Sequence, residues 1–169
     1  LLAQNGREHF VQADTTLDAA HKVQSDAFVV LRDSTSAIRA AGSRLMSDLT
    51  SSSSLQWMQA RAGAIATACE RSVAPLADAR SVTKGASLSR EVQKEKQADL
   101  LKEMESFAKV LTDCQVRWTG LSRDTSQTAL REKSPYEMKK LEEKLDKLNR
   151  AAQTYLRYIS VKLPPPGTP

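Results

Sequence analysis

Basic residues crowd a stretch near the end of the chain, and their chemistry is the binding of anionic groups. They are Lys139, Lys140, Lys144, Lys147, Arg150 and Arg157. At about 100° per residue on a helix they fall largely on one side, with Glu143 among them. Such a side suits lipid headgroups, nucleic acid or an acidic protein, and each basic residue contributes about 1 kcal/mol near an anionic membrane. The alternative is a solvated face that keeps a helix soluble.

Other residues that could do chemistry are few or wrongly spaced. His9 and His21 are the two histidines of the sequence, and no cysteine or carboxylate cluster stands at metal-ligand spacing beside them. Ser81-Val82-Thr83-Lys84 matches S-x-x-K but lacks the companion motifs of that enzyme class. The sequence has no glycine-rich phosphate loop, and no aromatic residues alternate with the basic set. We therefore expect no enzyme, no cofactor, no metal site and no nucleic-acid binding.

The two cysteines bear on the compartment. Cys69 and Cys114 each fall at an apolar position of a helical pattern, which predicts buried free thiols in a reducing compartment. This indicates a cytoplasmic protein, with a peripheral place at a membrane or the cytoskeleton. No apolar run approaches the ~20 residues of a membrane span, and no signal peptide is visible. The chain begins at Leu1 without Met, which suggests an excised domain.

Long helices must position these residues. The chain has 169 residues with six glycines and six prolines, and Pro75 is the one proline between residues 1 and 134. This composition predicts an all-α fold, with a single helical domain over residues 1–163. Residues 164–169 read as a proline-rich tail or linker in polyproline II conformation. The Pro166 to Pro169 spacing is a weak signal for an SH3-type partner.

Apolar spacing predicts the first half of the bundle. We expect a first helix over residues 9–49. Along it, a row of residues spaced seven apart lies on one side: Phe10, Leu17, Gln24, Leu31, Ile38 and Leu45. Gln24 interrupts this row as a register device or a solvated end position. Gly42 indicates close packing or a bend. Serines at 51–54 form the first turn, and the pattern resumes at Leu55, with Pro75 expected to kink it and Trp57 to flank the core.

Two further seams complete the pattern. One comprises Leu100, Met104, Phe107, Leu111 and Trp118. The other lies on a last helix over residues 134–163 and comprises Met138, Leu141, Leu145, Leu148, Tyr155 and Ile159. Ser134 is the expected N-cap of this helix, Pro135 its first residue and Glu137 its capping-box partner. Steps of three and four predict that the two seams pack antiparallel, through a turn just before Ser134.

The segment 83–87 leaves two architectures open. If Gly85 ends one helix and Ser87 caps the next, the chain forms an up-down-up-down four-helix bundle. If the helix runs straight through, residues 55–130 form one helix of roughly 110 Å, and three long antiparallel helices leave open seams that require a homodimer.

The second layout resembles a BAR-type domain. The similarity lies in an alanine-rich first helix, the serine-rich turn, Val73-Ala74-Pro75-Leu76 in a very long second helix, and the Ser134-Pro135 restart before Lys139-Lys140-Leu141-Glu142-Glu143-Lys144-Leu145. The resemblance implies three kinked helices that dimerise into a curved membrane-binding shell. The last helix departs from that family, because Pro164 stops it after about 29 residues instead of near the full length of the second.

Two hypotheses on function follow. The first is a non-enzymatic, dimerising BAR-like module that binds an anionic membrane through its basic faces. The second is a scaffold subunit of a cytoskeletal or multiprotein assembly, which binds a helical protein partner by seam-to-seam packing.

Overall fold

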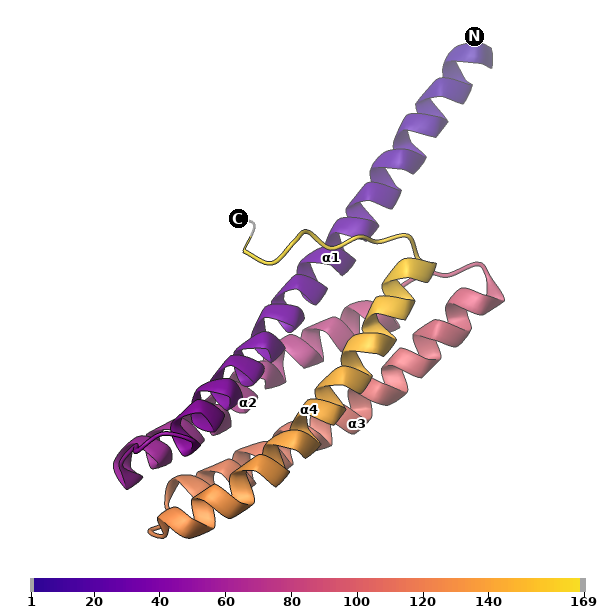
Figure 1. Cartoon of the computed structure of the whole chain (residues 1–169). Coiled ribbons are helices and arrows are strands. Elements are labelled where there is room, and N and C mark those ends of the chain that lie inside the picture. Colours follow the sequence, from indigo (N-terminus) through magenta and orange to yellow (C-terminus); the bar gives the residue numbers. More distant parts are fainter. Residues whose placement is uncertain (1, 168–169) are drawn as a thin grey trace.

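The chain folds into four long helices connected by short turns. The computed structural model describes the backbone of residues 2–167 and the side chains of residues 18–167. The helices are α1 (Leu2–Leu49), α2 (Leu55–Lys84), α3 (Glu91–Ser122) and α4 (Gln127–Tyr158), and each runs antiparallel to the one before it (Figure 1). Each helix packs on the next, and α4 also contacts α1, which closes the bundle. No strand occurs in residues 2–167, so the expected all-α fold is confirmed.

One apolar core fills the space between the helices. Ile38 and Leu45 of α1 and Met58 and Ile65 of α2 are fully buried. All the residues of the two later seams are buried as well: Leu100, Met104, Phe107, Leu111, Trp118, Met138, Leu141, Leu145, Leu148, Tyr155 and Ile159. The side chains of Phe10 and Leu17, two members of the first row, lie outside the described residues. The apolar seams therefore pack against other helices of the same chain.

The break near Gly85 decides between the two architectures. Helix α2 ends at Lys84, where the Gly85 N–H donates to the Ser81 carbonyl at 3.0 Å. The Thr83 carbonyl, in the last turn of α2, accepts both the Ala86 N–H at 3.3 Å and the Gln97 side chain at 2.7 Å. The four-helix alternative is thus the one formed, and the single helix over residues 55–130 is not. The expected Ser87 cap is wrong, because α3 begins at Glu91 after Arg90.

The start of α4 corrects the sequence prediction. The helix begins at Gln127, and the Ser126 hydroxyl accepts the Ala129 N–H at 3.1 Å as its N-cap. Pro135 therefore lies inside the helix, and Ser134, the expected cap, is fully buried. The physical reason is the core: the additional turns place Leu130 at zero exposure, which offsets the hydrogen bond lost at the proline.

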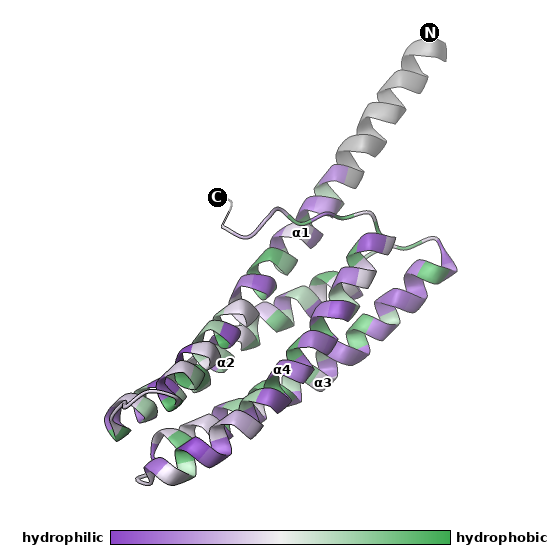
Figure 2. Cartoon of the chain, viewed as in Figure 1, coloured by the Kyte–Doolittle hydropathy of each residue, from purple (hydrophilic) through white to green (hydrophobic). Residues whose placement is uncertain are grey.

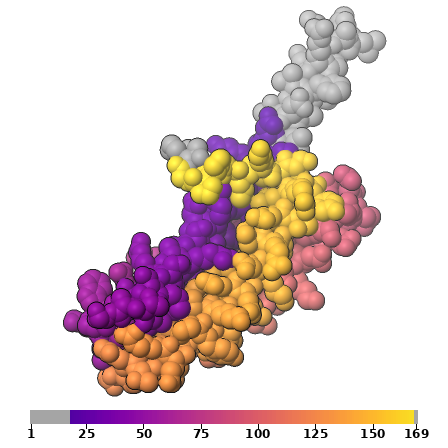
Figure 3. Space-filling model, in the orientation of Figure 1, coloured from indigo at the N-terminus to yellow at the C-terminus, as the bar shows by residue number. Residues whose placement is uncertain are grey.

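The end of α4 also differs from the expectation, because the helix stops at Tyr158, before Pro164. The Ser160 N–H donates to the Arg157 carbonyl, and the Val161 N–H donates to the Leu156 carbonyl at 2.9 Å. Ser160 takes the left-handed conformation, with φ 59°, that this type of helix end requires. The chain then leaves the helix and crosses α1, where Arg32 Nη1 donates to the Pro164 carbonyl at 2.5 Å (Figure 3).

Smaller expectations have mixed outcomes. Close packing at Gly42 is confirmed, since a Cβ there would stand 2.4 Å from Met138 Sδ. Helix α2 continues through Pro75. The placement of Trp57 as a core flank is wrong: its side chain is 58% exposed, and the Arg61 guanidinium stacks over its ring at 5.2 Å.

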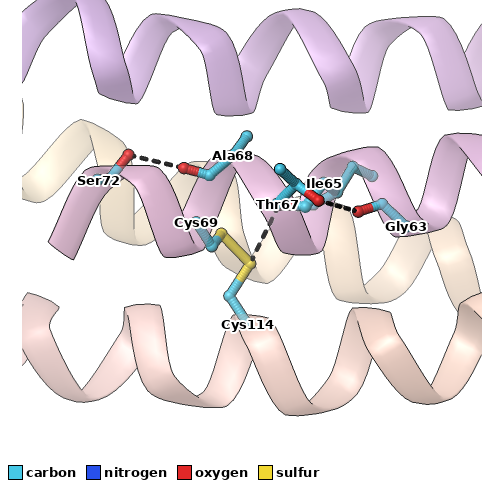
Figure 4. Close-up of a disulfide and its surroundings, with 7 residues drawn as sticks. All are labelled: Gly63, Ile65, Thr67, Ala68, Cys69, Ser72 and Cys114. Atoms are coloured by element: carbon cyan, nitrogen blue, oxygen red, sulfur yellow. Dashed lines mark hydrogen bonds between the residues drawn. A yellow bond between two sulfur atoms is a disulfide. The ribbon is translucent and has the colours of Figure 1, made fainter.

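The cysteines are the main correction, because Cys69 and Cys114 form a disulfide between α2 and α3 (Figure 4). They are not free thiols. Both are buried, and their Cα atoms lie 6.2 Å apart, within the range that a disulfide spans. Seam positions on two neighbouring antiparallel helices face each other, which brings the two sulfurs together.

Candidate anion-binding face

The outer side of α4 carries the basic residues singled out from the sequence. Lys139, Lys140, Lys144, Lys147, Arg150 and Arg157 are all exposed. The buried residues of α4 hold them in place: Met138, Leu141, Leu145 and Leu148 fix the inward side of the helix on the core. The outward side is consequently hydrophilic along its length (Figure 2). We call this side, with Tyr136 and Glu143, the outer face of α4.

The charged side chains of the outer face of α4 form no ion pairs with other described residues. Among the described residues, none of its six basic side chains takes part in a salt bridge. Two acids of the same helix pair with other helices: Glu137 with Arg117 of α3 at 3.3 Å, and Asp146 with Arg39 of α1 at 2.6 Å. These two carboxylates are thereby bound to α3 and α1 and do not neutralise the lysines of the outer face of α4.

Local contacts orient part of this face. Lys140 Nζ lies 5.3 Å from the centre of the Tyr136 ring, a cation–π contact. Arg150 Nε donates to the Asp146 carbonyl at 3.4 Å, one helical turn back. Glu143 is exposed within the face and reduces its positive charge.

The basic region continues onto α3, which the sequence analysis missed. Lys147 and Arg150 border a shallow hollow of about 440 Å³ together with Lys96 and Lys102 of α3. Asp99 and Glu103 line the same hollow, and Lys96 already lies within 4.0 Å of Asp99. These acids make the α3 side of the hollow less cationic than α4. The spacing of these residues gave no signal in the sequence, because the hollow forms only where α3 and α4 lie side by side.

The main buried polar contact is structural. Tyr155 is fully buried, and burial raises the pKa of its phenol to about 12. Its hydroxyl lies 3.4 Å from Gln24 Oε1, and Gln24 Nε2 donates to the Val82 carbonyl at 3.1 Å. Gln24, the polar residue in the first row, thus connects α1 with α2 and α4, in agreement with a register role.

The described part of the chain contains neither a cluster of metal ligands nor a membrane-spanning helix. No group of three or more histidine, cysteine, aspartate or glutamate side chains is placed to hold a metal ion. No helix there combines the length and the apolar content needed to cross a membrane.

Fold and site together define a four-helix antiparallel bundle with a basic outer face. Comparison with known proteins adds no family to this class: no family model, no curated protein and no solved structure matches the chain significantly.

Proposed function

We propose that this chain is a non-enzymatic helical interaction module that binds an anionic membrane surface through the outer face of α4. The observation that carries the proposal is that its six exposed basic residues form no salt bridge with any described residue, while the neighbouring acids Glu137 and Asp146 pair with other helices. Unpaired surface cations gain most from an external anionic surface, because binding does not first have to break an internal pair.

The size of the effect is sufficient for reversible binding. At about 1 kcal/mol for each basic residue near an anionic bilayer, the face supplies several kcal/mol, reduced by Glu143. Screening over roughly 10 Å at 0.1 M salt makes this attraction sensitive to ionic strength. The module is therefore a peripheral, salt-dependent membrane binder.

The other layouts considered for the chain receive less support. A BAR-like shell requires one helix through residues 85–90, a segment that is not helical. Partner binding or dimerisation by seam packing requires open seams, but Leu145 and the other seam residues are buried against the chain's own helices. We accordingly base the proposal on surface charge.

The disulfide bears on where this binding takes place. Disulfides persist in oxidising compartments and are rare in the cytosol. The pairing of Cys69 with Cys114 favours an oxidising compartment over the cytoplasmic location expected from free thiols.

Charge reversal tests the proposal. Replacement of Lys140, Lys144 and Lys147 by glutamate removes three attractions and adds repulsion, so the partition onto phosphatidylserine-containing liposomes should fall on the order of 100-fold. Liposome co-sedimentation at 0.1 M salt measures this partition, and wild-type protein should not bind neutral phosphatidylcholine liposomes.

A matched variant controls for net charge. Arg71, Lys84 and Lys109 are also exposed, form no salt bridge among the described residues, and lie on α2 and α3. Their reversal to glutamate should leave most of the binding intact. Equal losses in the two triple variants, or no binding of the wild-type protein, would refute the proposal.

A further inference from the structure

A second site lies in a cavity of about 530 Å³ between α1 and the last part of α4, and it shares Arg157 with the outer face of α4. Phe28 and Leu31 of α1 and Leu145, Leu148 and Leu156 of α4 form its apolar walls. Each of these side chains is at most 5% exposed, so the walls are held by the core. The volume falls within the ~300–1,000 Å³ range of small-molecule sites.

The charged side chains around this cavity are all basic. Arg32, Arg157 and Lys162 line it, and none of its lining residues is acidic. Arg157 and Lys162 are exposed and Arg32 is partly so, which gives the cavity an apolar interior and a cationic rim. An apolar cavity with convergent cations matches a ligand that has a hydrocarbon chain and an anionic head.

The segment after α4 covers this cavity. The turn at Ser160 carries the chain away from α4, and residues 160–163 form part of the lining (Figure 3). Arg32 holds the segment through its bond to the Pro164 carbonyl, and its Nε also lies 3.3 Å from Asp33 Oδ1. Asp33 is 60% exposed, so this second pair is weak. A carboxylate accepts from a guanidinium more strongly than a neutral carbonyl does.

We propose that this cavity binds one long-chain fatty acid, with the acyl chain between α1 and α4 and the carboxylate on Arg32. The lining residues of α4 extend from Leu145 to Arg157, a length of about 18 Å at 1.5 Å per residue. This length accommodates an extended long acyl chain. The carboxylate takes the place of the Pro164 carbonyl on the guanidinium, and the covering segment retains its contacts at Val161, which is buried.

Palmitate is the probe for this site. Isothermal titration of the intact disulfide-bonded chain, below the concentration at which palmitate aggregates, should give saturable binding of one palmitate per chain. Arg32→Gln should weaken this binding about tenfold, because a charge-assisted hydrogen bond is lost. Arg44→Gln, an exposed arginine of α1 outside the cavity, should leave the affinity unchanged.

Ligand variation separates the head from the chain. Hexadecanol, which has the same chain without the charge, should bind about tenfold more weakly than palmitate, and octanoate should also bind more weakly. The proposal fails if palmitate does not saturate, if the two arginine variants bind equally, or if hexadecanol matches palmitate. Ala152→Phe places a ring in the cavity wall and should abolish binding while the helical signal is retained. None of Lys140, Lys144 and Lys147 lines this cavity, so its test is independent of the membrane test.

Discussion

Ser134 shows how a single residue is constrained by the helix that contains it. The Ser-Pro-Tyr-Glu sequence has the features of a helix start, yet the segment lies inside α4, and the Ser134 side chain is at zero exposure. Its hydroxyl oxygen is buried and has no hydrogen-bond partner among the residues that the structure describes. A hydroxyl in this position costs free energy relative to an apolar group of similar size.

Removal of that hydroxyl should therefore stabilise the protein. Ser134→Ala is expected to raise the free energy of unfolding by about 1 kcal/mol, as measured by urea denaturation. Ser72→Ala is the control, because the Ser72 hydroxyl is also buried but donates to the Ala68 carbonyl at 2.9 Å. Ser72→Ala should give no gain. A free energy of unfolding that does not rise in Ser134→Ala, or that falls as it does in Ser72→Ala, would contradict this account of Ser134.

Tyr155 gives the protein a pH-dependent stability in the alkaline range. Burial raises the pKa of its phenol from 10.0 to about 12, so the folded state holds the proton more tightly than the unfolded state. The resulting stability is complete below pH 10 and is lost as the pH rises through 12. The loss amounts to about 2 kcal/mol from this one group.

The measurement compares unfolding at pH 9 and pH 12 in wild type and Tyr155→Phe. The variant should lose about 2 kcal/mol less than wild type over this interval, since the titrating group is absent. All other titratable groups are the same in the two proteins. Tyr136→Phe removes an exposed phenol and should retain the wild-type decline. Identical declines in wild type and Tyr155→Phe would show that Tyr155 is not the source.

At the scale of the elements, the disulfide fixes α2 against α3. It joins residues 45 apart in sequence, and the loop that it closes restricts the unfolded chain. Reduction should lower the free energy of unfolding by about 2–4 kcal/mol, measured by urea denaturation with and without reductant. In the double variant Cys69→Ala and Cys114→Ala the reductant should have no effect. A wild-type midpoint unchanged by the reductant would contradict the stabilising role of the disulfide.

Element positions followed from apolar spacing where that spacing was continuous. The seams of α3 and α4 could be predicted residue by residue, from Leu100 to Trp118 and from Met138 to Ile159, because a narrow stripe permits one inward orientation. Boundaries were less predictable. Ser126 and Ser134 are both competent caps, and the burial of Leu130, a tertiary effect, selects the earlier one. Whether the helix ends at Gly85 was ambiguous for the same reason: the hydrogen bond from Gln97 to this helix end comes from α3, a tertiary contact.

The sites were predictable to different degrees. The basic residues of α4 could be identified because charge opposite a seam must point outward. Their freedom from salt bridges could not, since it depends on Arg39 and Arg117 of other helices holding the nearby acids. The cavity beside Arg32 had no sequence signal, because its walls come from α1, α4 and the segment that returns after Ser160. The disulfide required knowledge of which seams face each other.

At the scale of the whole molecule, the apolar seams of the four helices are buried against one another, and the surface is mainly polar and charged. The sequence has a net charge of +5, from 25 basic and 20 acidic residues. Asp146 and Glu137 of α4 pair with Arg39 of α1 and Arg117 of α3, which leaves the outer face of α4 cationic. Membrane binding by this account has an orientation, with α4 toward the lipid.

That orientation can be measured directly with two tryptophan positions of similar exposure. Tyr136 lies within the outer face of α4 and is 64% exposed, whereas Trp57 lies on α2 and is 58% exposed. Trp118 is buried and contributes equally in both proteins. Wild type reports from Trp57, and the double variant Tyr136→Trp with Trp57→Phe reports from the α4 face. Both are mixed with anionic vesicles that carry a nitroxide on the lipid headgroup. We expect strong quenching in the double variant and little in wild type. Quenching that is equal at the two positions, or greater at Trp57, would contradict the assignment of the outer face of α4 as the membrane-binding surface.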